Sequence, residues 1–284
     1  MSLFDALVHL ATGAPGAPHR RGDTAIAHRA RLLGKLKGAA PDAADALNLI
    51  RREIDALPVQ ADRNHLGTHL VRYLQTYLMV PQGPDDRSGR VVDIGGPSLH
   101  NAPLTELKRW QIETVAILSI DYERDPLPFA DQSCDGVLLC EVIEHFVLDP
   151  LHCFHEINRV LKPGGFLVVT TPNAASWFAI YQALAQNHPS RWPVYSGDQT
   201  KARNHIHARE YLVTDLGALL DAAGFEVTGV KTRDYGIAPA YRPLPGFLTM
   251  HRGETIFVRA RKVGPPKKRF APPLYVEDVA ADAP

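Results

Sequence analysis

The sequence predicts an α/β fold in which a mostly parallel sheet carries helices on both faces. Short apolar runs alternate with helical patterns between residues 90 and 262, which is the order of elements typical of parallel sheets. Hydrophobic residues make up 45% of the 284 residues, so the chain can bury a sizeable core. The first 88 residues lack β-branched runs, and we therefore expect a helical extension before the sheet.

The helical extension, residues 1–88, shows its pattern in two segments. Residues 42–57 place apolar side chains at helical spacing, and residues 64–80 carry a leucine at every fourth position. The run PQGPDDRSG at 81–89 ends this pattern, because proline and glycine interrupt regular structure. The extension would either cap the active site or form a contact between two copies of the chain, and the sequence leaves both open.

The predicted sheet domain covers residues 89–263. Its strands are predicted at 90–94, 114–120, 136–142, 166–171, 225–232 and 254–262. Its helices are predicted at 104–110, 151–161, 177–186 and 214–224. The remaining residues, 264–284, are rich in proline and charge, so we expect a loosely ordered tail.

Composition excludes several classes of function. Lys and Arg total 31 and balance 31 Asp and Glu, which disfavours nucleic acid as a partner because phosphate binding needs surplus cations. The cysteines, Cys134, Cys140 and Cys153, form no even set, which predicts free thiols in a reducing compartment. The chain has no apolar window of about 18 residues, so we expect a cytoplasmic protein without a membrane partner.

Two strand ends carry candidate binding residues. The first strand ends in Asp93, Gly95 and Gly96, where glycines let the backbone approach a ligand closely; a tight turn that needs glycine only to bend is the alternative. The second strand ends in Asp121 and Tyr122, a carboxylate that can accept ribose hydroxyls and a ring that can pack on adenine. A solvent-facing acid is the alternative there. In a doubly wound sheet, ligands bind at the carboxyl ends of the strands.

Six motifs in order carry a family resemblance. DIGG, LPFADQSCD, CEVIEHF, INRVLKPGG, TTPN and LLDAAGF lie between Arg90 and Lys262. This series resembles the class I S-adenosylmethionine-dependent methyltransferases, the broad family of small-molecule and sugar methyltransferase domains. The resemblance implies a Rossmann-like seven-stranded sheet whose last strand, residues 254–262, is antiparallel, and S-adenosyl-L-methionine as the cofactor.

The resemblance also assigns residues to the methionine end of the cofactor. It implies that Asp93, Gly95 and Gly96 hold this end, and that Cys140 and Glu141 line it. The glycine loop of the family usually continues with a third glycine, whereas GGPS stands here, so the shape of the loop is in doubt.

The nucleoside end is less completely matched. The resemblance implies that Asp121 holds the ribose, with Tyr122 and Leu127 near the adenine. The segment between the glycines and Leu127 is short for two helices and two strands, so the third strand is compressed or missing. Asp121 then matches either of two acidic positions of the family, and Glu113 or Glu123 is the fallback for the other role.

Histidines near the mouth of the expected site suggest the chemistry. A hydroxyl acceptor has a high pKa and needs a general base, for which we nominate His145 and the competing His205. We therefore predict O-methylation of a sugar or another small hydroxylated metabolite. An N-methyltransferase, whose amine acceptor needs less base assistance, and a catalytically inactive binding protein are the alternatives. A nicotinamide-dependent oxidoreductase is disfavoured because the G-x-G-x-x-G spacing is missing.

A metal site is not predicted. His145, His152, Cys153 and His155 fall close together, and two of them share a helix face at spacing i, i+3. No second cluster has ligand spacing, and the resemblance implies an exposed helix here. The sequence therefore predicts no metal.

Overall fold

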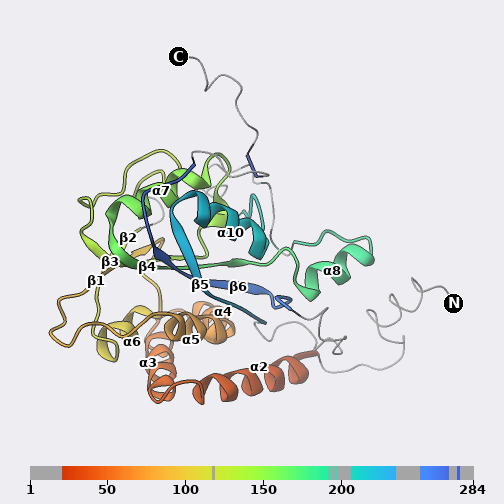
Figure 1. Cartoon of the computed structure of the whole chain (residues 1–284). Helices are drawn as coiled ribbons and strands as arrows, with labels where there is room; N and C mark the ends of the chain where they lie inside the picture. Colours follow the sequence, from red (N-terminus) through yellow and green to blue (C-terminus); the bar gives the residue numbers. More distant parts are fainter. Residues whose placement is uncertain are drawn as a thin grey trace.

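The computed structural model describes residues 21–116, 119–190, 192, 195, 197, 206–234, 250–268 and 274–275, with side chains from residue 27 onward. One sheet organises these residues, in the strand order β2-β1-β3-β4-β6-β5 (Figure 1). The strands are β1 (Arg90–Ile94), β2 (Gln111–Val115), β3 (Cys134–Cys140), β4 (Leu161–Pro172), β5 (Phe225–Arg233) and β6 (Thr255–Lys262). β2, β1, β3 and β4 are parallel, and β6 is antiparallel to both of its neighbours.

This sheet confirms the predicted α/β class and the antiparallel last strand, but it has six strands rather than seven. From residue 116 to residue 133 the described chain runs through turns, so the strand expected between β2 and β3 is missing there. β2 also begins three residues earlier than the predicted segment 114–120, because it pairs in register with β1 from Gln111 opposite Arg90.

Alternating side chains direct the two faces of the sheet toward different helices. Leu138 of β3 and Val168 of β4 face one hydrophobic cluster, while Leu139 and Val169, one residue further, face the other. The first cluster receives α2 (Arg21–Lys37), α3 (Ala43–Asp55), α4 (Gln60–Thr68), α5 (Leu70–Met79) and α6 (Asn101–Glu106), and the second receives α7 (Pro150–Val160) and α10 (Val213–Ala222) (Figure 1). Both faces are therefore covered, as expected for a mostly parallel sheet.

The N-terminal helices form one of these two covering layers. Tyr77 of α5 is fully buried, and Lys108, which follows α6, donates from Nζ to the Tyr77 carbonyl at 2.8 Å and to the Val80 carbonyl. The predicted single helix over 64–80 is broken at His69 into α4 and α5. Gly67 and Thr68 have low helix propensity, and the Thr68 hydroxyl donates back to the His65 carbonyl. The boundary at residue 88 stays a prediction.

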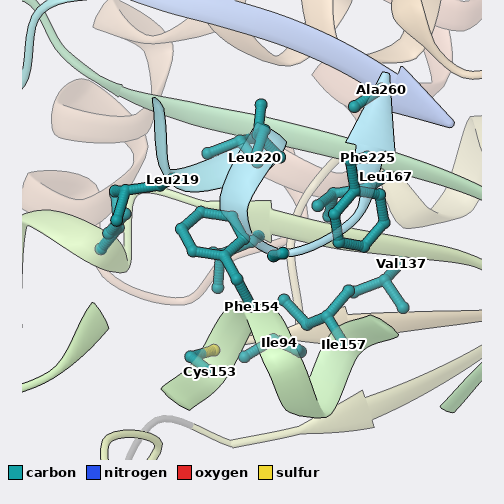
Figure 2. Close-up of a cluster of buried hydrophobic side chains, with 14 of the residues drawn as sticks. Ile94, Val137, Cys153, Phe154, Ile157, Leu167, Leu219, Leu220, Phe225 and Ala260 are labelled. Atoms are coloured by element: carbon teal, nitrogen blue, oxygen red, sulfur yellow. The ribbon is translucent and has the colours of Figure 1, made fainter. Parts of the chain in front are cut away.

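The opposite layer contains a core of buried aliphatic and aromatic side chains (Figure 2). Phe154 and Ile157 of α7 and Leu219 and Leu220 of α10 are fully buried against the sheet. The first residues of the tail are attached to this layer, since Lys267 N donates to the Ala222 carbonyl at 2.7 Å. Among the described residues, no helix is long and apolar enough to cross a membrane.

Candidate functional site

The turn after β1 depends on two glycines and a buried carboxylate. Gly95 has φ +91°, and a Cβ there would lie 2.4 Å from Cγ2 of Val142. A Cβ on Gly96 would lie 2.0 Å from Oδ2 of Asp93. That same oxygen accepts hydrogen bonds from the Ser98 backbone N–H at 3.1 Å and from Asn101 Nδ2 at 2.8 Å. The turn therefore fits only glycine at both positions, and the two hydrogen bonds to Asp93 fix its shape.

Asp93 is fully buried, and its second oxygen, Oδ1, has no hydrogen-bond partner within the described part of the chain. Burial raises the pKa of Asp93 to about 6, although the hydrogen bonds from Asn101 and Ser98 act in the opposite direction. A buried acceptor without a donor is costly, so this oxygen is a candidate to receive a cationic or N–H group of a ligand.

A cavity of about 550 Å³ opens between this turn and the N-terminal helices. Its volume lies within the range of small-molecule sites. The carboxyl ends of three neighbouring parallel strands, β1, β3 and β4, meet at its floor, which is where ligands bind in open α/β sheets. It is lined by Glu53, Leu57, Leu66, Arg72, Tyr73, Thr76, Gly95, Pro97, Ser98, Leu99, His100, Asn101, Ala102, Cys140, Glu141 and Thr170.

An ion pair crosses this cavity. Arg72 of α5 contacts Oε2 of Glu141 at 2.9 Å, and the Thr170 hydroxyl donates to Oε1 of Glu141 at 2.9 Å. Both charged side chains are 16% exposed, so water screens them only partly. The N-terminal helices thus bring a guanidinium to the carboxylate at the end of β3, and a second carboxylate, that of Glu53, also lines the cavity.

Other polar atoms on the cavity wall have no partner. Within the described residues, the Thr76 hydroxyl, both ring nitrogens of His100 and Oδ1 of Asn101 are buried without a hydrogen bond. Burial, and secondarily the charge of Arg72, lowers the pKa of His100 to about 3, which keeps this ring neutral. Buried polar groups are nearly always hydrogen-bonded in native proteins, so these atoms fit a site that a polar ligand completes.

The predicted methionine-end residues converge on this cavity. Gly95, Cys140 and Glu141 line it, and Asp93 and Gly96 shape the turn beside it. Cys140 lies at the last position of β3, where burial raises the pKa of its thiol well above the usual value. A neutral, unreactive thiol suits a lining role rather than a nucleophilic one.

The predicted nucleoside-end residues do not line the cavity. Oδ1 of Asp121 accepts from the Glu123 N–H at 3.1 Å within a local turn. The Tyr122 hydroxyl donates to the Val115 carbonyl at 2.7 Å, and the Leu127 N–H donates to Glu156 at 2.9 Å. The Tyr122 hydroxyl lies next to the glycine turn, since it shares the Val115 carbonyl with the Gly95 N–H, but none of the three residues lines the cavity. Their contact with a nucleoside stays a prediction.

The two fallback carboxylates are engaged elsewhere. Glu113 forms an ion pair with Arg90 at 2.6 Å on the sheet edge. Glu123 accepts backbone N–H groups from residues 147, 148 and 149 at 2.6–3.0 Å, which fixes the loop before α7. Neither lines the cavity.

Of the two proposed bases, only His145 belongs to the described residues, and it follows the end of β3. His145, in the short helix η1 (Ile143–His145), donates from Nδ1 to the Ile206 carbonyl at 2.6 Å. Its ring meets that of His207 edge-on, with centroids 5.0 Å apart. His205 lies outside the described residues. Burial lowers the pKa of His207 to about 3, and burial followed by the charge of Glu141 raises the pKa of Glu144 well above its usual value.

Sequence reasoning missed several residues of this region. Arg72 had no signal beyond a place on a helix whose partners were unknown. His207 was visible only as a neighbour of His205 in the motif NHIH, whereas Glu144 immediately precedes the nominated His145. A carboxylate next to a candidate base was therefore the one available signal.

Part of the chain is similar to known proteins. Residues 90–169 match the model of the methyltransferase domain family. A "probable S-adenosylmethionine-dependent methyltransferase" of Mycolicibacterium smegmatis is 35% identical over 101 residues, 36% of this chain and 32% of that protein. A malonyl-(acyl-carrier protein) O-methyltransferase of a Marinomonas strain is 36% identical over 102 residues, 36% of this chain and 30% of that protein.

These matches span about a third of the length of the two relatives. Among solved structures, a methyltransferase of Thermotoga maritima aligns with a TM-score of 0.44 at 23% identity, covering 76% of this chain and 99% of that one.

Proposed function

We propose, on the premise that residues 90–169 form a class I S-adenosylmethionine-dependent methyltransferase domain, that the chain methylates a hydroxyl group of a small acceptor. The observation that carries the proposal is the cavity at the carboxyl ends of β1, β3 and β4, where a glycine turn, an ion pair and unpaired polar atoms meet. When bound, S-adenosyl-L-methionine supplies an electrophilic methyl group on a sulfonium, which is transferred in line to an acceptor as S-adenosylhomocysteine leaves.

The ion pair matches the amino acid end of that cofactor. A zwitterion carries an ammonium and a carboxylate, and Glu141 and Arg72 offer the complementary charges across the same cavity. Gly95 lines the cavity, so a ligand there would meet its backbone, and Oδ1 of Asp93 in the same turn has no donor among the described residues. These residues would hold the methionine end by charge pairing and backbone contact.

The acceptor would lie next to Glu144 and His145, just beyond Glu141 along the chain. Methyl transfer needs alignment of the nucleophile and removal of its proton, while the protein excludes water. His145 is held by the Ile206 carbonyl, so its ring has a fixed orientation. We infer that this histidine, or His205, removes the proton from the hydroxyl, and that a sugar or a similar hydroxylated metabolite is the acceptor.

The relative from Marinomonas is named as an O-methyltransferase, which favours oxygen over nitrogen as the nucleophile here. An N-methyltransferase would need less base assistance, and a binding protein without activity would need none.

Calorimetry with S-adenosylhomocysteine tests cofactor binding directly. We expect a 1:1 complex with a dissociation constant in the micromolar range, on the order of −8 kcal/mol. Absence of binding at millimolar ligand would contradict the proposal. Replacing His145 by Ala while binding persists tests the base: unchanged turnover in H145A and in H205A would remove both histidines from that role.

A further inference from the structure

A second polar cluster lies beside the cavity, where η1 meets the segment that leads into α10. Glu144, His145 and His207 each direct one potential ligand atom into it, and these three atoms lie within 4.8 Å of one another. Glu144 and His145 are neighbours in the chain, whereas His207 approaches from 62 positions further along. The fold therefore assembles a group that no local sequence pattern contains.

Two of these side chains are buried with an atom left unpaired. Glu144 is 1% exposed; its Oε2 accepts from the Thr171 hydroxyl at 3.0 Å, while its Oε1 has no partner within the described chain. His207 is 8% exposed, and its Nδ1 is likewise buried without a hydrogen bond there. An unsatisfied buried carboxylate oxygen and an unsatisfied imidazole nitrogen are each costly, and a shared cation would satisfy both.

His145 has the outer contact typical of a metal-ligating histidine. Its Nδ1–H donates to the Ile206 carbonyl at 2.6 Å, one residue before His207. A neutral imidazole that donates from Nδ1 carries its lone pair on Nε2. Ligating histidines in metalloproteins nearly always donate their other ring N–H to a carbonyl or a carboxylate in this way, because that bond fixes the tautomer and the ring orientation.

We propose that Glu144, His145 and His207 bind a divalent first-row transition-metal ion. Two imidazoles and one carboxylate suit zinc and its neighbours rather than calcium or magnesium, which prefer oxygen ligands. Three protein ligands leave a coordination position open, as in catalytic rather than structural sites.

The place of the site suggests its use, and this step rests on the proposed methyl transfer. Glu144 lies three residues beyond Glu141, which lines the cofactor cavity, so the ion would lie on the acceptor side. A hydroxyl in the open coordination position would be oriented toward the cavity, and the ion would lower its pKa; His145 would then act as a metal ligand in place of the general base.

The histidines grouped by sequence do not form this site. Cys153 is buried in the core, and His152, half-buried on α7, has its Nε2 3.2 Å from the Asp125 carbonyl. His155 contacts the Lys268 carbonyl at 3.1 Å. Only His145 of that group joins the cluster, and the partner it needed lies in a distant segment.

Cobalt(II) titration of the full chain, without cofactor or acceptor, tests the site by its visible absorption spectrum. We expect one equivalent to bind with the bands of a low-symmetry nitrogen and oxygen site, and zinc(II) to displace it. Failure to bind one equivalent would overturn the proposal. Calorimetry with S-adenosylhomocysteine on the same sample separates this failure from a failure of the methyltransferase proposal.

Variants locate the ion. Glu144→Gln keeps the shape of the side chain and an oxygen that accepts from Thr171. The single variants Glu144→Gln and His207→Gln are each expected to weaken cobalt binding at least 100-fold. His152→Ala is the matched control and should bind as the unaltered chain does. Equal affinity in all three variants would overturn the assignment. Circular dichroism verifies folding, and if His207→Gln does not fold, His145→Gln at a half-buried position replaces it.

Discussion

Two regions at opposite ends of the parallel strands, the Gly95 turn after β1 and the loop before β3, differ in how their polar groups are satisfied. Around Gly95, the hydroxyl of Thr76, the ring of His100 and one oxygen of Asp93 have no partner among the described residues. The loop of residues 127–131, which leads to the amino end of β3, is hydrogen-bonded to α7. The contrast separates a surface that is completed by a ligand from one that is complete already.

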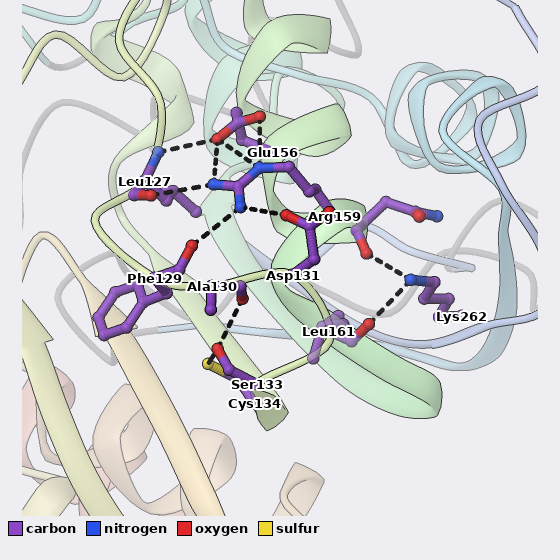
Figure 3. A network of polar contacts seen from close by, with 11 residues as sticks. Leu127, Phe129, Ala130, Asp131, Ser133, Cys134, Glu156, Arg159, Leu161 and Lys262 are labelled. Atoms are coloured by element: carbon purple, nitrogen blue, oxygen red, sulfur yellow. Dashed lines mark hydrogen bonds and ion pairs between the residues drawn. The ribbon is translucent and has the colours of Figure 1, made fainter.

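Arg159 of α7 forms several of the hydrogen bonds that hold this loop (Figure 3). Its guanidinium donates to the Leu127 carbonyl at 2.9 Å, to the Phe129 carbonyl at 2.8 Å and to Asp131 at 2.8 Å. It also pairs with Glu156 at 2.7 Å, and Glu156 accepts the Leu127 N–H. This loop is fixed to α7 whether or not a ligand is present, so its motif LPFAD has a structural role that sequence alone did not reveal.

The largest effect is expected from Gly95→Ala. The added Cβ would meet Val142 at 2.4 Å in a backbone conformation, φ +91°, that alanine rarely adopts. We expect the affinity for S-adenosylhomocysteine to fall at least 100-fold and the free energy of unfolding to fall by about 3 kcal/mol. Gly217→Ala, on α10 with no atom within 4 Å of the added group, is the control and should leave both unchanged or slightly stabilise the fold. Retained affinity in G95A would show that the turn does not contact the ligand.

Removing the hydrogen bonds around Arg159 should lower the free energy of unfolding. Arg159→Leu leaves two carbonyls and two carboxylates without their donor, and we expect a loss of about 3 kcal/mol in urea unfolding. The matched control is Arg261→Leu, whose ion pair with Glu226 lies on an exposed edge and should contribute less than about 1 kcal/mol. Equal losses in the two variants would mean that the network around Arg159 is not special.

The free energy of unfolding is expected to depend on pH through Asp93. Its folded-state pKa, about 6, lies above the ordinary value of 3.8, so the folded protein takes up this proton first as the pH falls. Relative to Asp93→Asn, the unaltered chain should gain about 2 kcal/mol of unfolding free energy between pH 7 and pH 4.5. Urea unfolding of both proteins at pH 7 and at pH 4.5 measures this difference. A loss of unfolding free energy at the lower pH, relative to Asp93→Asn, would mean that the carboxylate is stabilised as an anion.

The smallest effect concerns the ion pair. Arg72→Met removes the guanidinium that faces Glu141 and should weaken S-adenosylhomocysteine about tenfold, which corresponds to about 1.4 kcal/mol. Arg109→Met, which breaks an exposed pair with Asp85, serves as the control and should leave the affinity unchanged. An unaltered affinity in R72M would place the amino acid end of the ligand away from α5.

Periodicity and motif order predicted most of the sheet, since buried strands and amphipathic helices leave local patterns. The antiparallel last strand and the glycine turn followed from the resemblance. The break at His69 was missed because apolar spacing continues across it. The seventh strand that the resemblance implies is not confirmed among the described residues, where the segment before β3 forms turns.

The candidate site was predicted only where its residues are close in sequence to a strand end. Asp93 and Gly95 follow from the rule that ligands bind at the carboxyl ends of parallel strands, and Cys140 and Glu141 from the family resemblance. Arg72 reaches the cavity from a helix whose packing depends on the whole first layer. Such tertiary contacts leave no periodic signal in one sequence.

A crystal structure of the complex with S-adenosylhomocysteine tests the central claim most directly. The account predicts the amino acid end of the ligand in the cavity, between the Gly95 turn and the Arg72–Glu141 pair, with His100 or Asn101 newly hydrogen-bonded. A ligand bound outside this cavity, with the same polar atoms still unpaired, would contradict it.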